Sequence, residues 1–240
     1  MNPRRVVGLL PLPLLFGCDL LPIGGPVRVE YDFDDGAQGW TAGFADYSPG
    51  MEPTLEFDFG VRALPSELGD GRGYFIGGSN RSDDLLMYLT RRLGPGQGLM
   101  PNRTYRVDFV ITLASNAPSD CAGIGGAPGE GVTLKAGATP TRPELRRTDE
   151  GTWRLNVDTG QQTSGGAAAS VIGHIANGLP CESVDMQDPP YVRLQRQHTH
   201  THTVQTGAAG EVWIIVATDS GFEGRTELYY EHIAIALTPQ

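Results

Sequence analysis

The sequence predicts an all-β protein, an antiparallel β-sandwich of jelly-roll-like form with two long loops. Three observations predict this fold class. Apolar and polar residues alternate with a period of two in several segments. The 240 residues include 33 Gly and 18 Pro, which disfavour long helices. Clusters of Gly, Pro, Asn and Asp separate the alternating segments. The length suits one large β-domain, which we expect over residues 27–240.

The clearest strands are those whose apolar residues fall on one face. In Thr104–Leu113 the residues Tyr105, Val107, Phe109, Ile111 and Leu113 share a face. The same alternation predicts strands over Val27–Phe33, Gly131–Ala136 and Leu228–Leu237. Glu211–Thr218 is apolar on both faces, which predicts a central strand covered on both sides. Leu86–Leu93 fits either a strand or a short helix.

Two glycine-rich segments, Ala114–Glu130 and Asp158–Pro190, are predicted to be long loops. Each contains one cysteine, Cys121 or Cys181. A disulfide between them would tie the two loops into one layer, with two unpaired buried thiols as the alternative. Long ordered loops on a rigid sandwich are where binding sites are usually built.

The N-terminus is typical of an export signal, in which two arginines precede the apolar segment Val6–Gly17. That segment is too short to cross a bilayer of about 30 Å as a helix. It ends in Leu15-Phe16-Gly17-Cys18, which resembles the bacterial lipobox, although Phe16 departs from the usual small or β-branched residue.

This resemblance implies that residues 1–17 form a cleaved lipoprotein signal peptide and that Cys18 carries the lipid. Residues 18–26 would then be a tether, and the lipid would anchor the protein outside the cytoplasm of a bacterium, either in the periplasm or on the cell surface. An ordinary signal peptide or an uncleaved anchor is the alternative. Lipidation of Cys18 also accounts for the odd cysteine and leaves an even pair.

Net charge excludes one class of partner. The formal charge is −10, and removal of the signal makes the rest more acidic. Such a surface repels phosphate backbones, so we expect no nucleic-acid partner. Lys135 is the only lysine, which we attribute to genome bias.

Two short motifs carry a resemblance to a known fold family. Phe33-Asp34-Asp35-Gly36-Ala37-Gln38-Gly39-Trp40 and Tyr229-Tyr230-Glu231-His232-Ile233 resemble the first and last strands of galactose-binding-like, carbohydrate-binding jelly rolls. The resemblance implies that these strands lie together and that a structural Ca²⁺ is held near them by Asp34 and Glu231, with Asp32 as a further ligand. A solvated acidic edge with Asx turns is the alternative.

Most of the remaining chain resembles an uncharacterised group of bacterial secreted proteins, a likeness that brings no activity with it. The segments that carry it include Gly43–Tyr47, Asn80–Leu85 and Thr218–Gly224.

Aromatic and acidic residues supply the candidate ligand-binding side chains. Trp153 and Tyr47 are predicted to contact a ligand, whereas Trp40 and Trp213 are expected in the core. Asp219 and Glu223 follow the apolar central strand and are candidates for ligand binding, or for hydrolysis if held ~5–9 Å apart.

His198, His200 and His202 alternate with threonine, so on a strand they would share a face. Two such imidazoles can bind Zn²⁺ with a third ligand, although a polar strand at a sheet edge is the simpler interpretation. The sequence does not decide whether this segment binds metal.

The sequence contains no Gly-x-Ser-x-Gly, His-Glu-x-x-His or phosphate-cradling motif, so we assign no catalytic residue. These features together predict a membrane-anchored, extracytoplasmic ligand-binding module that binds a glycan. The alternatives are a secreted hydrolase with an acid- or metal-based site, and a structural envelope lipoprotein without a small ligand.

Overall fold

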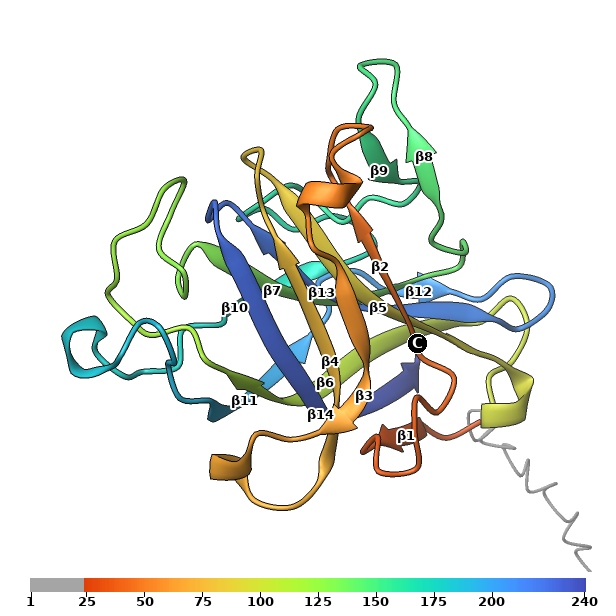
Figure 1. Cartoon of the computed structure of the whole chain (residues 1–240). Coiled ribbons are helices and arrows are strands. Elements are labelled where there is room, and N and C mark those ends of the chain that lie inside the picture. The colour runs from red at the N-terminus through yellow and green to blue at the C-terminus, as the bar shows by residue number, and fades with distance from the viewer. Residues whose placement is uncertain (1–23) are drawn as a thin grey trace, which may run out of the picture.

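The computed structural model describes residues 24–240, and their strands form two antiparallel sheets and a separate two-stranded hairpin (Figure 1). Residues 1–23 lie outside the described part, so the signal peptide and the lipidation of Cys18 stay predictions. Within residues 24–240 no helix is long and apolar enough to cross a membrane.

The first sheet has seven strands and contains both the first and the last strand of the described chain. Its path is β11-β6-β14-β4-β3, with β1 paired to β14 and β12 paired to β6. β1 pairs antiparallel with the C-terminal half of β14, as the resemblance to galactose-binding-like jelly rolls implies. The strands are β1 (Val27–Tyr31), β3 (Asp58–Ala63), β4 (Arg72–Ser79), β6 (Thr104–Ser115), β11 (Val192–Thr199), β12 (Val204–Gln205) and β14 (Arg225–Pro239).

The second sheet has five strands in the order β10-β7-β13-β5-β2. Its strands are β2 (Thr41–Ala45), β5 (Leu85–Leu93), β7 (Val132–Thr139), β10 (Ser170–His174) and β13 (Val212–Ser220). Leu86–Leu93 is therefore a strand and not a helix. A separate hairpin of β8 (Leu145–Arg147) and β9 (Trp153–Leu155) lies beside the end of β2 (Figure 1).

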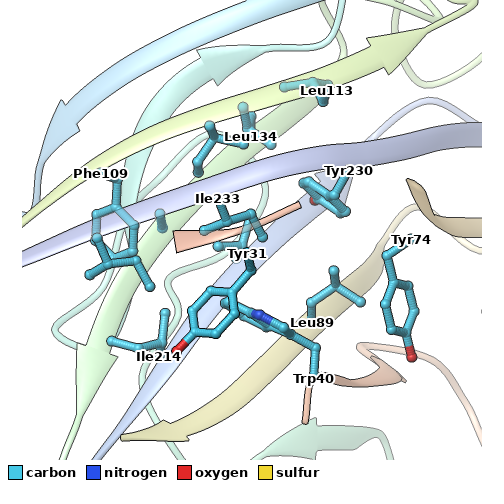
Figure 2. Packing of buried hydrophobic residues seen from close by; sticks show 14 of the residues in the cluster. Tyr31, Trp40, Tyr74, Leu89, Phe109, Leu113, Leu134, Ile214, Tyr230 and Ile233 are labelled. Atoms are coloured by element: carbon cyan, nitrogen blue, oxygen red, sulfur yellow. The ribbon is translucent and has the colours of Figure 1, made fainter. Parts of the chain in front are cut away.

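The core lies between the two sheets and consists of the residues that alternation places on their facing sides (Figure 2). On β6 the predicted apolar face, from Tyr105 to Leu113, is at most 2% exposed. Trp40 is buried in the core as expected, and its ring contacts the Tyr31 ring edge-on at 5.6 Å between centroids.

The outer face of the second sheet is covered as well. Ile215 and Ala217 of β13 pack there against Ala168 and Ala169, while Ile214 and Val216 face the core. The prediction of a central strand buried on both sides is thus confirmed. The cover comes from the chain between β7 and β10, which includes the β8–β9 hairpin.

Three expectations need correction or refinement. The predicted loop Asp158–Pro190 contains β10, a sheet-edge strand that the many glycines concealed. The β8–β9 hairpin was not predicted, because its strands of three residues are too short to show alternation. Trp213 is not a core residue: it faces outward on β13 and stays partly exposed beneath the Arg142 guanidinium.

Candidate functional site

The predicted disulfide between Cys121 and Cys181 is present and joins the two long loops. The loops also pair directly, since the Cys181 N–H donates to the Ser119 carbonyl at 3.0 Å. Between them and the start of β14 lies a cleft of about 300 Å³, which we call the loop cleft. This volume is at the lower end of the range for small-molecule sites.

The loop cleft has an apolar floor and a polar rim. Ala117 and Ile175 are buried in the floor, and Phe222 lines one side. Arg225 and Glu227 stand on the rim, where the guanidinium Nε donates to the carboxylate at 2.5 Å. Thr226 between them is buried, and its hydroxyl has no hydrogen-bond partner among residues 24–240.

A row of aromatic rings continues from Glu227 across the outer face of the first sheet. The Tyr191 hydroxyl donates to Glu227 at 3.3 Å, and its ring meets the Tyr229 ring edge-on at 5.3 Å. Tyr229 in turn contacts Phe75, which lies under the Arg62 guanidinium. Tyr191 and Tyr229 are both partly exposed, and we call them the tyrosine surface.

A second candidate site lies on the outer face of the other sheet and is built by strand register. Asp219 of β13 is opposite Leu86 of β5, and Asp84 comes two residues before Leu86. Leu86 is also opposite Ala45, the last residue of β2. Asp46 follows with φ of 64°, a left-handed conformation that breaks strand alternation and that Asp tolerates. One carboxylate oxygen from each aspartate lies within 4.8 Å of the others.

Two cations accompany these aspartates, and we call the five residues the acid cluster: Asp46, Asp84, Lys135, Asp219 and Arg154. The Lys135 ammonium is fully buried and donates to Asp219 Oδ2 at 2.7 Å and to the Thr159 carbonyl at 3.0 Å. Arg154 lies 3.6 Å from Asp46 and 3.7 Å from Asp84, and 38% of its side chain is exposed.

Burial changes the titration of two of the aspartates. It raises the pKa of Asp84 to about 8, and the neighbouring carboxylates of Asp219 and Asp46 raise it as well. Burial, followed by the charge of Asp219, raises the pKa of Asp46 to about 6. Near neutral pH Asp84 is therefore mostly protonated.

Only part of the acid cluster is accessible. A polar cleft of about 300 Å³, the acid cleft, is lined by Asp46, Arg154 and residues 155–160. Asp219 is fully buried behind it. Glycoside hydrolysis needs room for a sugar between two carboxylates ~5–9 Å apart. Of the three aspartates only Asp46 lines the acid cleft, so a sugar in it would meet one carboxylate and not a pair.

Three of the four predicted ligand-binding residues lie in or beside the acid cluster. Asp219 belongs to it. Tyr47 and Trp153 form a backbone bridge that holds Arg154 next to Asp46. Their rings point elsewhere: Tyr47 is 8% exposed and packs on Phe57 in the core, and Trp153 packs partly against the same core. Glu223 lies outside the cluster, in the turn between β13 and β14.

The structure does not gather the aspartates and glutamate predicted to bind Ca²⁺ into one group. Asp32 accepts from the Gln38 amide, Asp34 accepts from the Arg72 N–H, and Glu231 pairs with Arg193 at 2.7 Å. Among residues 24–240, the only group of three or more acidic, histidine or cysteine side chains placed to share an ion is Asp46, Asp84 and Asp219. A buried acidic triad that could hold a metal is therefore present, but at another place in the fold.

The histidines also have other partners. The Ser170 hydroxyl lies 2.6 Å from His198 Nε2 and 2.8 Å from His200 Nδ1, which ties β11 to β10 across the two sheets. Burial lowers the pKa of His200 to about 4. β11 ends at Thr199, so His202 lies in the following turn, where its ring contacts the Thr201 hydroxyl. This arrangement matches the simpler interpretation of a polar sheet edge.

Sequence reasoning missed Lys135 and Tyr191. Lys135 stands in Val132-Thr133-Leu134-Lys135-Ala136, and a lone lysine inside an apolar strand is itself a sign of a buried ion pair. Tyr191 follows Pro189-Pro190 and carries no periodic signal, because its position is set by the bridged loop.

No protein-family model matches the chain, and no curated protein matches it significantly. Among solved structures, similar folds are found in carbohydrate-binding modules and related β-sandwiches. TmCBM61 in complex with β-1,4-galactotriose is 11% identical with a TM-score of 0.38, over 85% of this chain and 92% of that one. CBM27-1 of Caldicellulosiruptor saccharolyticus, in complex with mannohexaose, is 8% identical with a TM-score of 0.37, over 86% and 95% of the two chains.

The enzymatically active domain of bacteriophage CBA120 tailspike protein 4 is 11% identical with a TM-score of 0.35. The match covers 85% of this chain, which spans only 20% of the tailspike chain. With all three TM-scores below 0.5, these likenesses do not indicate what this chain binds. The class of the protein follows from its own structure, a two-sheet β-sandwich with a disulfide-linked loop cleft and a buried acid cluster.

Proposed function

We propose that this chain is a lipid-anchored, extracytoplasmic module that binds a glycan in the loop cleft and along the tyrosine surface. The observation that carries the proposal is the lining of the loop cleft. An apolar floor lies beneath a rim with an arginine and a glutamate. A sugar ring presents C–H groups on its faces and hydroxyls around its edge, and this lining is complementary to both.

The tyrosine surface supports an extended ligand over a single sugar. Tyr191 and Tyr229 lie beside Glu227, so a chain whose first ring occupies the cleft would meet partly exposed aromatic rings as it leaves. Aromatic side chains provide a large apolar contact together with a polar tip, at little conformational cost. Carboxylate and guanidinium groups add directional hydrogen bonds.

Binding is tested with purified protein on a glycan array, followed by calorimetry on any oligosaccharide that is retained. We expect Tyr191→Ala or Tyr229→Ala to weaken binding about three- to tenfold, the loss typical of one aromatic contact. Gln197→Ala, an exposed change on β11, is the matched control and should leave affinity unchanged. Absence of binding to any glycan, or equal loss in the control, would contradict the proposal.

The anchor is tested separately. Cys18→Ala should abolish incorporation of radiolabelled palmitate and move the protein from the membrane fraction to the soluble fraction. Membrane association that persists without label would favour the uncleaved anchor. Release of both the wild type and Cys18→Ala into the medium would favour an ordinary signal peptide.

A further inference from the structure

The acid cluster contains acceptor atoms that nothing in the described protein satisfies. Asp219 Oδ1 has no hydrogen-bond partner, although the residue is fully buried. Neither oxygen of Asp84 has a hydrogen-bond partner either, and that residue is 9% exposed. A buried carboxylate left in this condition is costly. These oxygens face one another and Asp46, so they mark one small volume that favours a positive charge.

Not every carboxylate around this volume has a hydrogen-bonded cation as its partner. Three carboxylates face two cations, and only Lys135 makes hydrogen bonds to its partners. Arg154 stays beyond hydrogen-bond distance of both Asp46 and Asp84 and is the exposed member of the cluster. When Asp84 keeps its proton, Asp46 and Asp219 face Lys135 and Arg154. When that proton leaves, two negative charges remain beside the Lys135–Asp219 pair, opposite the partly exposed Arg154.

We propose that Asp46, Asp84 and Asp219 bind one divalent cation of the hard, oxygen-preferring class, such as Ca²⁺ or Mg²⁺, which displaces the Arg154 side chain. The donor set is all carboxylate, without the imidazole or thiolate that Zn²⁺ prefers. Binding would release the Asp84 proton to solvent, and the two negative charges that then remain beside the Lys135–Asp219 pair match one divalent ion. Lys135 keeps its bonds to Asp219 Oδ2 and Thr159, which leaves Asp219 Oδ1 for the metal.

The acid cleft provides the route for the ion. Asp46 and Arg154 both line it, so an ion that enters from solvent reaches Asp46 first and meets Arg154 at the mouth. The polar cleft also leaves space for water, which completes the coordination that three monodentate carboxylates cannot fill alone. This site is separate from the loop cleft, so the cation proposal and the glycan proposal can fail independently.

The experiment measures the thermal midpoint and calorimetric binding of EDTA-treated protein with CaCl₂, MgCl₂ and MnCl₂ at up to 10 mM. We expect at least one ion to raise Tm by several degrees and to bind with a stoichiometry of one. Asp46→Asn should abolish both effects. Asp149→Asn, an exposed change at the tip of the β8–β9 hairpin, is the matched control and should preserve them.

The variant Arg154→Gln distinguishes a cation-binding site from a set of side chains that serves only to stabilise the fold. If Arg154 competes with the ion, its removal tightens binding by tenfold or more, whereas in a purely structural network the variant binds no ion. The residue is partly exposed, so the variant is expected to fold. The proposal is overturned if neither the wild type nor Arg154→Gln binds any of the three ions. It is also overturned if Asp46→Asn binds as the wild type does.

Discussion

The loop cleft and the acid cleft have equal volumes, each about 300 Å³, but their chemistry differs. The loop cleft is walled by two bridged loops and is mostly apolar. The acid cleft lies over the ends of strands and leads to buried ion pairs. Both lie at the same end of the sandwich, because Ser220 ends β13 and Arg225 begins β14 a few residues later. One end of a sandwich can thus carry two unrelated sites when loops build one and strand register builds the other.

The largest expected effect comes from removing the buried cation of the acid cluster. Lys135→Met leaves Asp219 buried without its cation, which should lower the free energy of unfolding by about 3–5 kcal/mol. The double variant Lys135→Met/Asp219→Leu removes both charges and should recover at least half of that loss. Urea unfolding measures both. A double variant as unstable as the single one would show that the cluster is not held by this pair.

Removal of the disulfide tests the stability of the loop cleft in the same way. Cys121→Ala/Cys181→Ala should cost about 2–4 kcal/mol in unfolding free energy, since the bridge constrains a long loop of the unfolded chain. It should also weaken glycan binding while the response of Tm to CaCl₂ persists. Loss of the metal response in this variant would mean that the two clefts are coupled.

The acid cluster also predicts how stability depends on pH. The pKa of Asp46 is about 6 and that of Asp84 about 8, both above the ordinary 3.8, so the folded state holds these protons more tightly than the unfolded state. Their stabilising contribution is full below pH 4 and is lost as the pH rises through 6 and 8. We expect the free energy of unfolding to decrease between about pH 5 and 9 in EDTA.

Asp84→Asn should flatten that decrease above about pH 7, and an unchanged slope would contradict the assignment.

His200 gives stability the opposite dependence on pH, in a lower pH range. Its pKa is about 4 in the folded state against the ordinary 6.5, so its contribution is present above 6.5 and is lost as the pH falls towards 4. Unfolding by urea at several pH values separates the two slopes.

The smallest expected effect distinguishes the acids that the sequence predicts to bind Ca²⁺ from those of the acid cluster. Asp34→Asn removes an exposed carboxylate that accepts only a backbone hydrogen bond from Arg72, so stability should change by less than about 1 kcal/mol. The response to CaCl₂ should stay as in the wild type. A lost response in Asp34→Asn, with a normal one in Asp46→Asn, would restore the sequence-based calcium site.

Periodicity in the sequence was enough to predict the sandwich, the doubly buried β13 and the identity of the β6 core face. Cysteine counting was enough to predict the bridge between Cys121 and Cys181. These features depend on local alternation or on parity, which a single sequence displays.

The acid cluster could not be predicted in the same way. Asp46, Asp84 and Asp219 converge through the pairing of three strands and the left-handed backbone at Asp46, neither of which periodicity shows. The failure of Tyr47 as an exposed aromatic has a related cause. Its backbone pairing with Trp153 turns the ring into the core, and that partner lies in a strand too short to recognise.

The pairing of the first strand with the last has a consequence for orientation. Val27 lies opposite Leu237, whereas Arg225 on the rim of the loop cleft is at the other end of β14. At about 3.3 Å per residue these two positions are roughly 40 Å apart. Any surface that holds the chain by its N-terminal end would therefore leave the loop cleft facing outward, at the far tip of the molecule.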